Sequence, residues 1–166
     1  MISSNKKIKP LLLFSIVILT ACSSIDCPLN NRVYTNYILQ TAEHNVDTMK
    51  LFMTISTNRT DGSDTVIINK DVNVTQFSLP ISNAQHSDVF FVELADSLGS
   101  STLDTVTVNK EDYIHFESTD CTPSYFHTLT SVSSTHNAID SVVINTNAVD
   151  YDTTKKHFYI YFAPRH

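Results

Sequence analysis

Glycine is scarce in this sequence of 166 residues, which contains only two. A glycine-rich phosphate loop needs several glycines at fixed spacing, and neither of these two stands in such a context, so a nucleotide-binding cradle is excluded. The Gly-x-Ser-x-Gly and His-Glu-x-x-His signatures of hydrolases and zinc proteases are also missing. We therefore expect a protein that is not an enzyme.

Long apolar runs are absent as well. The run Leu11–Leu19 is far shorter than the roughly 20 apolar residues that cross a hydrocarbon core. It follows Lys6, Lys7 and Lys9 and precedes small residues, a pattern that is typical of a cleaved secretory signal.

The end of this run resembles the bacterial lipobox, with the residues Leu-Thr-Ala-Cys at positions 19–22. The resemblance implies a lipoprotein signal peptide over residues 1–21, cleavage before Cys22, a thioether-linked lipid on Cys22 and an acyl chain such as palmitate on the new amino terminus. The alternative is an ordinary signal peptide followed by a chance cysteine. Because one acyl chain holds a protein only marginally and a lipoprotein carries more, we expect stable membrane attachment.

The residues after Cys22 bear on the location of the protein. Ser23 and Ser24 follow it, with no aspartate directly after the cysteine, which by analogy with known sorting rules favours the outer membrane. No acidic run follows either, so the periplasmic side is expected. We predict a lipidated tether over residues 22–32 and a single domain over residues 33–166.

Basic residues are too few for a nucleic-acid-binding protein. Eleven Lys and Arg stand against 17 Asp and Glu, a formal charge of −6, and loss of the signal would remove three further lysines. Phosphate contacts need clustered Lys and Arg, so we expect no nucleic-acid partner. The same balance argues against a basic patch that docks on anionic lipid.

Two cysteines remain once Cys22 is assigned to the lipid. Because the periplasm is oxidising, Cys27 and Cys121 are expected to form a disulfide. The alternatives are two free thiols or a metal site.

Alternating polar and apolar residues run through most of the chain after residue 33. Phe158, Ile160 and Phe162 alternate with polar or amphipathic neighbours, and residues 88–94 form a fuller apolar run that predicts a more buried strand. Asn and Asp provide most of the expected turns, at residues 58–62, 69–71, 83–86, 97–100 and 145–147. We predict an all-β fold, an antiparallel β-sandwich of immunoglobulin-like form, with a small barrel as the alternative.

Several histidines and carboxylates have spacings that could suit a metal ion. His115 and Glu117 are two residues apart and project from one face of a strand, and His127 stands on a second segment, so zinc could bind between them. Calcium could bind at either of two acidic turns. The alternative is that all of these are surface or turn residues. The residues of the two turns are Asn58, Asp61 and Asp64, and Asn147, Asp150 and Asp152.

A further pattern, Asp followed by Ser or Thr and then an aliphatic residue, Met or Thr, resembles the acceptor motif for O-glycosylation in the Bacteroidetes envelope. The resemblance implies modification of at least one hydroxyl, although strands that begin at a turn aspartate would produce the same pattern. The six candidate acceptors are Thr48, Thr65, Ser97, Thr105, Ser141 and Thr153.

Three longer segments, residues 74–80, 115–121 and 125–128, together with Cys27-Pro28, resemble a family of small uncharacterised Bacteroidetes envelope lipoproteins. That family carries a domain of unknown function, so the resemblance implies location and fold but no chemistry. The first hypothesis for function is a non-catalytic accessory or structural subunit of an envelope complex, with an outer-membrane barrel protein as a candidate partner. The alternative is a periplasmic module that binds calcium, a transition metal or a glycan.

Overall fold

The computed structural model describes residue 27, residues 32–58 and residues 62–164. In this part of the chain every regular element is a strand, which confirms the predicted all-β class. The strands are β1 (Tyr34–Gln40), β2 (Phe52–Asn58), β3 (Asp64–Asp71), β4 (Gln76–Pro80), β5 (Ser87–Ala95), β6 (Ser101–His115), β7 (Ser124–Ser134), β8 (Ile139–Ile144), β9 (Ala148–Val149) and β10 (Phe158–Phe162).

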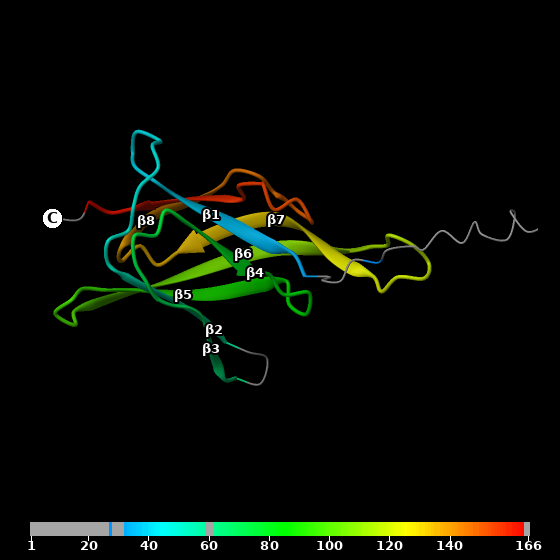
Figure 1. Cartoon of the computed structure of the whole chain (residues 1–166), viewed down its shortest axis with the longest axis horizontal. Coiled ribbons are helices and arrows are strands. Elements are labelled where there is room, and N and C mark those ends of the chain that lie inside the picture. Colours follow the sequence, from blue (N-terminus) through cyan, green and yellow to red (C-terminus); the bar gives the residue numbers. More distant parts are fainter. Residues whose placement is uncertain (1–26, 28–31, 59–61, 165–166) are drawn as a thin grey trace, which may run out of the picture.

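Two sheets pack face to face, which confirms the predicted β-sandwich (Figure 1). The four-stranded sheet has the order β4-β1-β10-β8, and the six-stranded sheet has the order β3-β2-β5-β6-β7-β9. Among the described strands the β1–β10 pair is parallel and the other pairs are antiparallel. None of the described residues forms a helix that is long and apolar enough to span a membrane.

The parallel β1–β10 pair joins the beginning of the domain to its end. Tyr37 lies opposite Phe158 on β10 and opposite Phe77 on β4, and its ring stacks on both, with centroids 4.7 and 4.8 Å apart. Such cross-strand aromatic pairs stabilise a sheet beyond the area that they bury. At the start of β10 the ring of His157 accepts a hydrogen bond from the Asn36 backbone at 3.0 Å, which holds the same two strands in register.

The core lies between the sheets and draws on nearly every strand. On β5 the buried and half-buried residues alternate without interruption, and Phe90, Val92 and Leu94 point inward. The predicted apolar run at residues 88–94 is therefore a central strand with one face in the core and its other face half-buried. On β6, Val106 and Val108 continue the same inner face.

The connection between β5 and β6 shows how the chain turns with so little glycine. Asp96 Oδ1 accepts the backbone N–H groups of Leu98 and Ser100 at 2.8 and 2.9 Å, which closes the turn through a side chain. Gly99 occupies the one position of this turn with a positive φ, of 92°, where a side chain would be strained.

Asp104 anchors a second loop from inside the protein. Its carboxylate is buried at the inner face of β6 and accepts the backbone N–H groups of Asn137, Ala138 and Ile139 at 2.7 to 2.9 Å, together with the Thr135 hydroxyl at 2.8 Å. Burial alone would raise the pKa of this carboxyl, but the donors outweigh it and leave the pKa below its ordinary value. One side chain thus fixes the connection between β7 and β8.

Replacing Asp104 by Asn leaves one acceptor where two were used and turns an amide toward backbone donors. We expect Asp104→Asn to lower the free energy of unfolding by about 2–3 kcal/mol at neutral pH, measured by urea denaturation. The folded-state pKa of Asp104 is depressed, so its stabilisation is present above the unfolded-state pKa of about 4 and is lost as the pH falls through the folded value. The difference in the free energy of unfolding between the native protein and Asp104→Asn should therefore become smaller at acidic pH.

Asp64→Asn is the matched control, because Asp64 is exposed and also begins an Asp-Thr-Val segment. Equal losses of stability in the two variants would contradict this account of Asp104.

Candidate functional site

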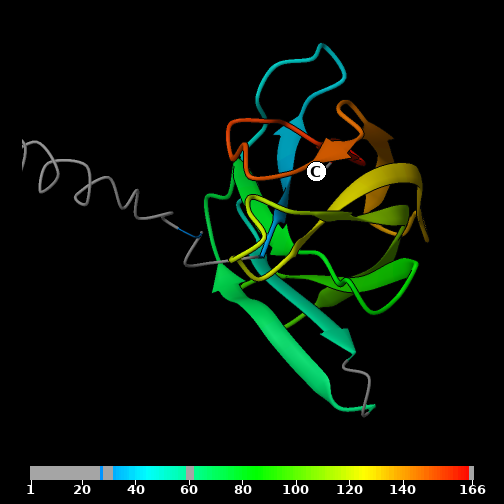
Figure 2. The ribbon, with the colours of Figure 1, turned by 90° about the vertical axis from the view of Figure 1, so that its right-hand side faces the viewer.

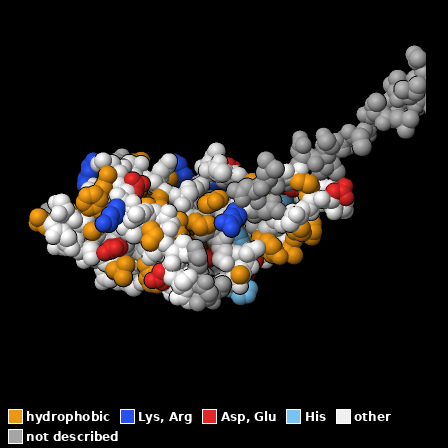
Figure 3. Space-filling view, turned by 60° about the horizontal axis from the view of Figure 1, so that its bottom comes forward, with side chains coloured by type: hydrophobic (Ala, Val, Ile, Leu, Met, Phe, Trp, Pro, Cys, Tyr) orange, Lys and Arg blue, Asp and Glu red, His pale blue; other side chains and the backbone are white. Residues whose placement is uncertain are grey.

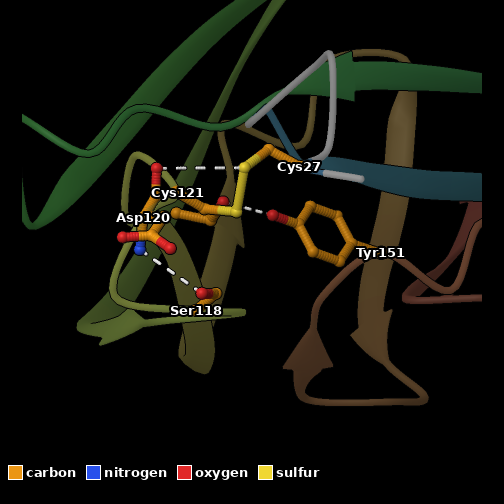
Figure 4. Close-up of a disulfide and its surroundings, with 6 residues drawn as sticks. Cys27, Ser118, Asp120, Cys121 and Tyr151 are labelled. Carbon is orange, nitrogen blue, oxygen red and sulfur yellow. Dashed lines mark hydrogen bonds between the residues drawn. A yellow bond between two sulfur atoms is a disulfide. The ribbon is translucent and has the colours of Figure 1, made fainter. Parts of the chain in front are cut away.

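A disulfide fixes the amino-terminal segment to one end of the sandwich. Cys27 and Cys121 are bonded, with S–S 2.07 Å and Cα atoms 5.5 Å apart, which is the pairing expected from the sequence (Figure 4). Cys121 lies in the β6–β7 connection, where its N–H donates to the Ser118 carbonyl at 3.3 Å and closes a turn. The predicted lipid site, Cys22, lies outside the described residues.

The bond joins residues 94 positions apart. In the chain-entropy account, closing a loop of about 100 residues stabilises a fold by about 4–5 kcal/mol. Because Cys27 precedes β1, the bond also holds in place a segment that has no strand of its own to pair with in the described chain. The disulfide therefore fixes the point from which the amino-terminal segment leaves the domain.

Aromatic rings cover the outer face of the β6–β7 hairpin beside this disulfide. His115 stacks on Phe126, with centroids 4.3 Å apart, and Tyr151 meets Phe126 edge-on at 4.9 Å. The Tyr151 hydroxyl is hydrogen-bonded to Ser124, and its ring lies next to the disulfide (Figure 4). His115 is therefore a packing residue in this structure, with its Nε2 2.9 Å from Glu117 Oε1.

The structure does not assemble the predicted zinc site. His115 and Glu117 are in contact, but His127 lies opposite Asp112 across the β6–β7 pair. Asp112 and His115 are three residues apart on β6, so their side chains leave opposite faces of the sheet. Glu117 lies beyond the end of β6, so its contact with His115 forms in the β6–β7 connection and not along a strand face, and the pairing register places the two histidines on different sides of the sheet.

No group of three His, Cys, Asp or Glu in the described part of the chain could hold a metal ion. At the second acidic turn, Asp150 pairs with Lys155 and accepts the Asp152 N–H at 2.9 Å. Asp152 in turn accepts the N–H of Thr154 at 3.0 Å. These carboxylates stabilise the turn itself, and calcium binding here stays a prediction. At the first turn Asp61 lies outside the described residues.

A network of buried charges crosses the inner face of the six-stranded sheet near the disulfide end. The Lys110 ammonium is fully buried and donates to Asp112 Oδ1 at 2.7 Å and to the Gln85 carbonyl at 2.6 Å. Asp88 Oδ2 lies 3.9 Å from the same ammonium. Two carboxylates and a carbonyl therefore compensate one buried cation, as a charge in a protein interior requires.

His127 extends this network. Its Nδ1 lies 2.6 Å from Asp112 Oδ1. Burial lowers the pKa of the imidazole below its ordinary value, even though the carboxylate of Asp112 acts in the opposite direction. A neutral ring beside an ionised carboxylate must carry its proton on Nδ1, so Nε2 is left as a hydrogen-bond acceptor.

Asp88 differs from the other acidic groups of the network. Burial raises the pKa of its carboxyl to about 6, although Lys110 and the Ser82 N–H act in the opposite direction. The Ser82 N–H donates to both carboxylate oxygens, at 3.2 and 3.3 Å. Asp88 is thus the acid in this network whose charge changes nearest to neutral pH.

A hollow of about 740 Å³ opens beside this network at the end of the sandwich. Asp88 and His127 line it from the sheet, and Tyr125 and Pro123 line it from the β6–β7 hairpin. Arg32, Asn83 and Gln85 line it as well, so the hollow offers both hydrogen-bond donors and acceptors beside an aromatic ring. Of these residues, only His127 was predicted from the sequence as a site residue, and Asp88, Lys110 and Asp112 were not. The sequence does contain a signal for Lys110 and Asp112, because they continue the two-residue alternation of Val106 and Val108 and so occupy inward positions on β6.

The candidate glycosylation acceptors differ in their exposure. Ser97 and Thr153 are exposed in turns, whereas Thr105 and Ser141 are half-buried strand residues. Thr65 Oγ1 is buried within β3, so Thr65 is a wrong choice, because a glycan needs an accessible hydroxyl. Thr48 is half-buried. Ser97 and Thr153 are the acceptors that remain best placed, and their modification stays a prediction.

The outer face of the six-stranded sheet carries exposed apolar side chains. We call the side chains of Phe52, Val66, Phe91 and Leu103 the outer-face patch. Val66 pairs with Ser56, which pairs with Phe91, so Val66, Ser56 and Phe91 form one row across β3, β2 and β5. Val66 is 55% exposed, and Phe52 and Leu103, on the same face of β2 and β6, are 38% and 52% exposed. Hydrophobic side chains appear in several groups on this side of the molecule, with charged groups between them (Figure 3).

The fold and these sites define an all-β sandwich domain with a disulfide at one end and a buried ion network next to it. The profile of a family of unknown function, DUF6452, matches residues 52–162, from the first residue of β2 to the last of β10. The chain belongs to this family, as expected for an uncharacterised domain. No curated protein and no solved structure matches the chain.

The raised pKa of Asp88 predicts an unusual pH dependence of stability. In the unfolded chain an aspartate ionises near pH 4, whereas in the fold Asp88 holds its proton up to about pH 6. Its contribution to stability therefore decreases as the pH rises from 4 to 7. We expect the stability of the native protein relative to Asp88→Asn to fall by about 2 kcal/mol between pH 4 and pH 7, measured by urea denaturation. A constant difference between the two proteins would contradict the shift.

Proposed function

We propose that this protein is a Bacteroidetes envelope lipoprotein, anchored through Cys22 on the periplasmic side of the outer membrane. Its sandwich acts as a non-catalytic accessory or structural subunit of an envelope complex. The observation that carries the second part is the outer-face patch, because soluble domains rarely leave neighbouring large apolar side chains exposed without a binding partner.

The disulfide supports the proposed anchor. Cys27 lies five positions after Cys22 in the sequence and is bonded to the folded domain. A lipid on Cys22 would therefore hold the disulfide end of the sandwich close to the membrane. The other parts of the sandwich would extend into the periplasm, where a partner could reach them.

Edge strand β3 adds to the proposed contact surface. The β2–β3 hairpin projects from the body of the domain, and β3 pairs on one side only with a described strand (Figure 2). Its register with β2 shifts twice, around Ile55, so a continuous strand could not be added along its whole length. We therefore expect a partner to contact the patch through apolar side chains, with backbone pairing limited to the regular stretch Asp64–Val66.

A lipid-anchored subunit of this kind would meet proteins that are embedded in the same membrane. An outer-membrane barrel protein is the partner that we expect, because its periplasmic turns lie at the height of a domain held close to the bilayer. The acidic balance of the chain, 17 Asp and Glu against 11 Lys and Arg, favours a partner with basic residues around an apolar contact.

Cross-linking in native membranes tests the subunit proposal. A carboxyl-terminal tag on the full chain should recover one envelope protein in reproducible, stoichiometric amount. Val66→Lys combined with Leu103→Lys should reduce that recovery at least tenfold, because charges in an apolar contact must be desolvated.

The matched control is Val143→Lys, in which the replaced valine is also exposed, by 48%, but belongs to β8 of the other sheet. It should leave the recovery unchanged. Equal loss in both proteins, or no companion at all, would contradict a partner at the outer-face patch.

The hollow favours a second candidate function, a ligand-binding module. The Asp88 carboxylate and the His127 Nε2 are acceptors, and Asn83 and Gln85 bring amide groups to the same hollow, so a ligand whose groups both donate and accept, such as the hydroxyl groups of a glycan, fits it. Tyr125 offers a ring on which a sugar face could pack. The volume of about 740 Å³ lies within the range of small-molecule sites.

Thermal unfolding with a panel of neutral oligosaccharides tests this second candidate. One of them should raise the melting temperature of the native protein in a saturable way. Asp88→Asn should lose most of that rise, because an amide replaces one acceptor oxygen with a donor. A panel without effect on the native protein would count against glycan binding.

A further inference from the structure

The β6–β7 hairpin continues past the point where the opposite sheet can cover it. Along β6 the inner-face positions run from the buried Val106 and Val108 through Lys110 and Asp112 to Ile114. Ile114 is 53% exposed although it continues the face that elsewhere forms the core, and Phe116, two residues further on, is 61% exposed. We call Ile114 and Phe116 the hairpin tip.

The tip lies at the same end of the molecule as the disulfide. In Figure 1 the connection after β6 extends to the right of the sandwich, beside the short blue piece at residue 27. Figure 3 shows hydrophobic side chains gathered at this right-hand end. Single exposed apolar residues need no explanation, but a large aliphatic and an aromatic side chain next to each other at one loop indicate a contact.

Chain lengths decide what that contact can reach. The Cα atoms of Cys27 and Cys121 are 5.5 Å apart, and the turn that the Ser118 carbonyl closes brings Cys121 near Ser118. Phe116 is two residues before Ser118, so its Cα lies within about 20 Å of that of Cys27. The five residues from Cys22 to Cys27 extend at most about 18 Å, so a lipid on Cys22 leaves the tip within reach of the bilayer surface.

The charges around the tip select the kind of lipid surface. Between Glu111 and His127 the sequence contains no Lys or Arg, and His115 pairs with Glu117 next to the tip. Such a segment gains nothing from anionic headgroups, which attract clusters of basic residues. Aromatic and aliphatic side chains without basic neighbours favour the interfacial region of a neutral bilayer.

We propose that Ile114 and Phe116 dock into the headgroup region of the membrane that carries the Cys22 lipid, on a surface of zwitterionic phospholipid. This inference rests on the proposed lipid anchor and adds a second, orienting contact. When the Cys22 lipid and the hairpin tip are both in the membrane, the disulfide end of the sandwich faces the bilayer and the β5–β6 connection points away from the bilayer.

The absence of tryptophan from the chain gives a direct test. Phe116→Trp introduces a single tryptophan, which can be excited selectively, at the tip of the mature, lipidated protein, which is reconstituted into phosphatidylcholine vesicles with brominated acyl chains. We expect its emission to shift to the blue and to lose most of its intensity relative to vesicles without bromine. The matched control is Leu98→Trp, because Leu98 is 91% exposed in the β5–β6 connection at the opposite end of Figure 1. Its emission should remain unquenched.

Vesicle flotation in the same samples separates the two proposals. Protein that does not float with the vesicles would show that the anchor is wrong. Protein that floats while Phe116→Trp stays unquenched would overturn the docking and leave the anchor standing. Blue-shifted but unquenched emission of Phe116→Trp would mean that protein covers the tip. Equal quenching of Phe116→Trp and Leu98→Trp would mean that the tip is not the particular point of contact. Either result overturns the inference.

Replacing part of the phosphatidylcholine by phosphatidylglycerol tests the headgroup assignment. We expect the quenching of Phe116→Trp to decrease, because the acidic hairpin is repelled from an anionic surface. Stronger quenching on the anionic vesicles would overturn the assignment to zwitterionic lipid. Circular dichroism of each variant with a native strand spectrum confirms that the comparison is made on folded protein.

Discussion

The two-residue alternation of β6 is the constraint on which most of this structure depends. Its inner face meets, in order, the loop anchor Asp104, the core residues Val106 and Val108, the buried cation Lys110 and its partner Asp112. Because alternate side chains of a strand share a face, one strand places the loop anchor, the core and the ion network on a single line. A slip of one residue would turn all of them outward and bury their neighbours instead.

The two polar sites on this line are compensated in different ways. At one end, backbone N–H groups surround the Asp104 carboxylate, so an anion is stabilised without a counter-charge. At the other end, Lys110 is a fully buried cation and needs Asp112, Asp88 and a carbonyl. The second site therefore depends on the register of β5 with β6 and on the loop that carries Gln85. It leaves Asp88 and His127 beside open space in the hollow. The polar groups that could interact with a ligand, Asp88 and His127, therefore lie at the buried ion network, which is the least apolar part of the interior.

Local features of this fold follow closely from the sequence. The turn at residues 97–100 forms as predicted, because Asp96 and Gly99 supply the side-chain acceptor and the positive φ that it needs. The predicted turn at residues 69–71 does not interrupt the chain. It lies inside β3, where Lys70 adopts a φ of 51° and the register with β2 shifts. Asn, Lys and Asp tolerate a strand irregularity as well as a turn, so their composition alone does not separate the two.

The sequence by itself determined the strand period, the all-β class, most of the turns and the pairing of Cys27 with Cys121, since each depends on residue type and short-range order. Only the tertiary structure decided which strands pair and in which register. That register separated His115 from His127, placed Asp88 of β5 next to Lys110 of β6, and left Ile114 uncovered although it alternates like a core residue. A side chain's neighbours across a sheet come from distant parts of the chain, and the opposite sheet ends where its own strands end. Neither the neighbours across a sheet nor the point where the opposite sheet ends is encoded in the local alternation from which the strands were predicted.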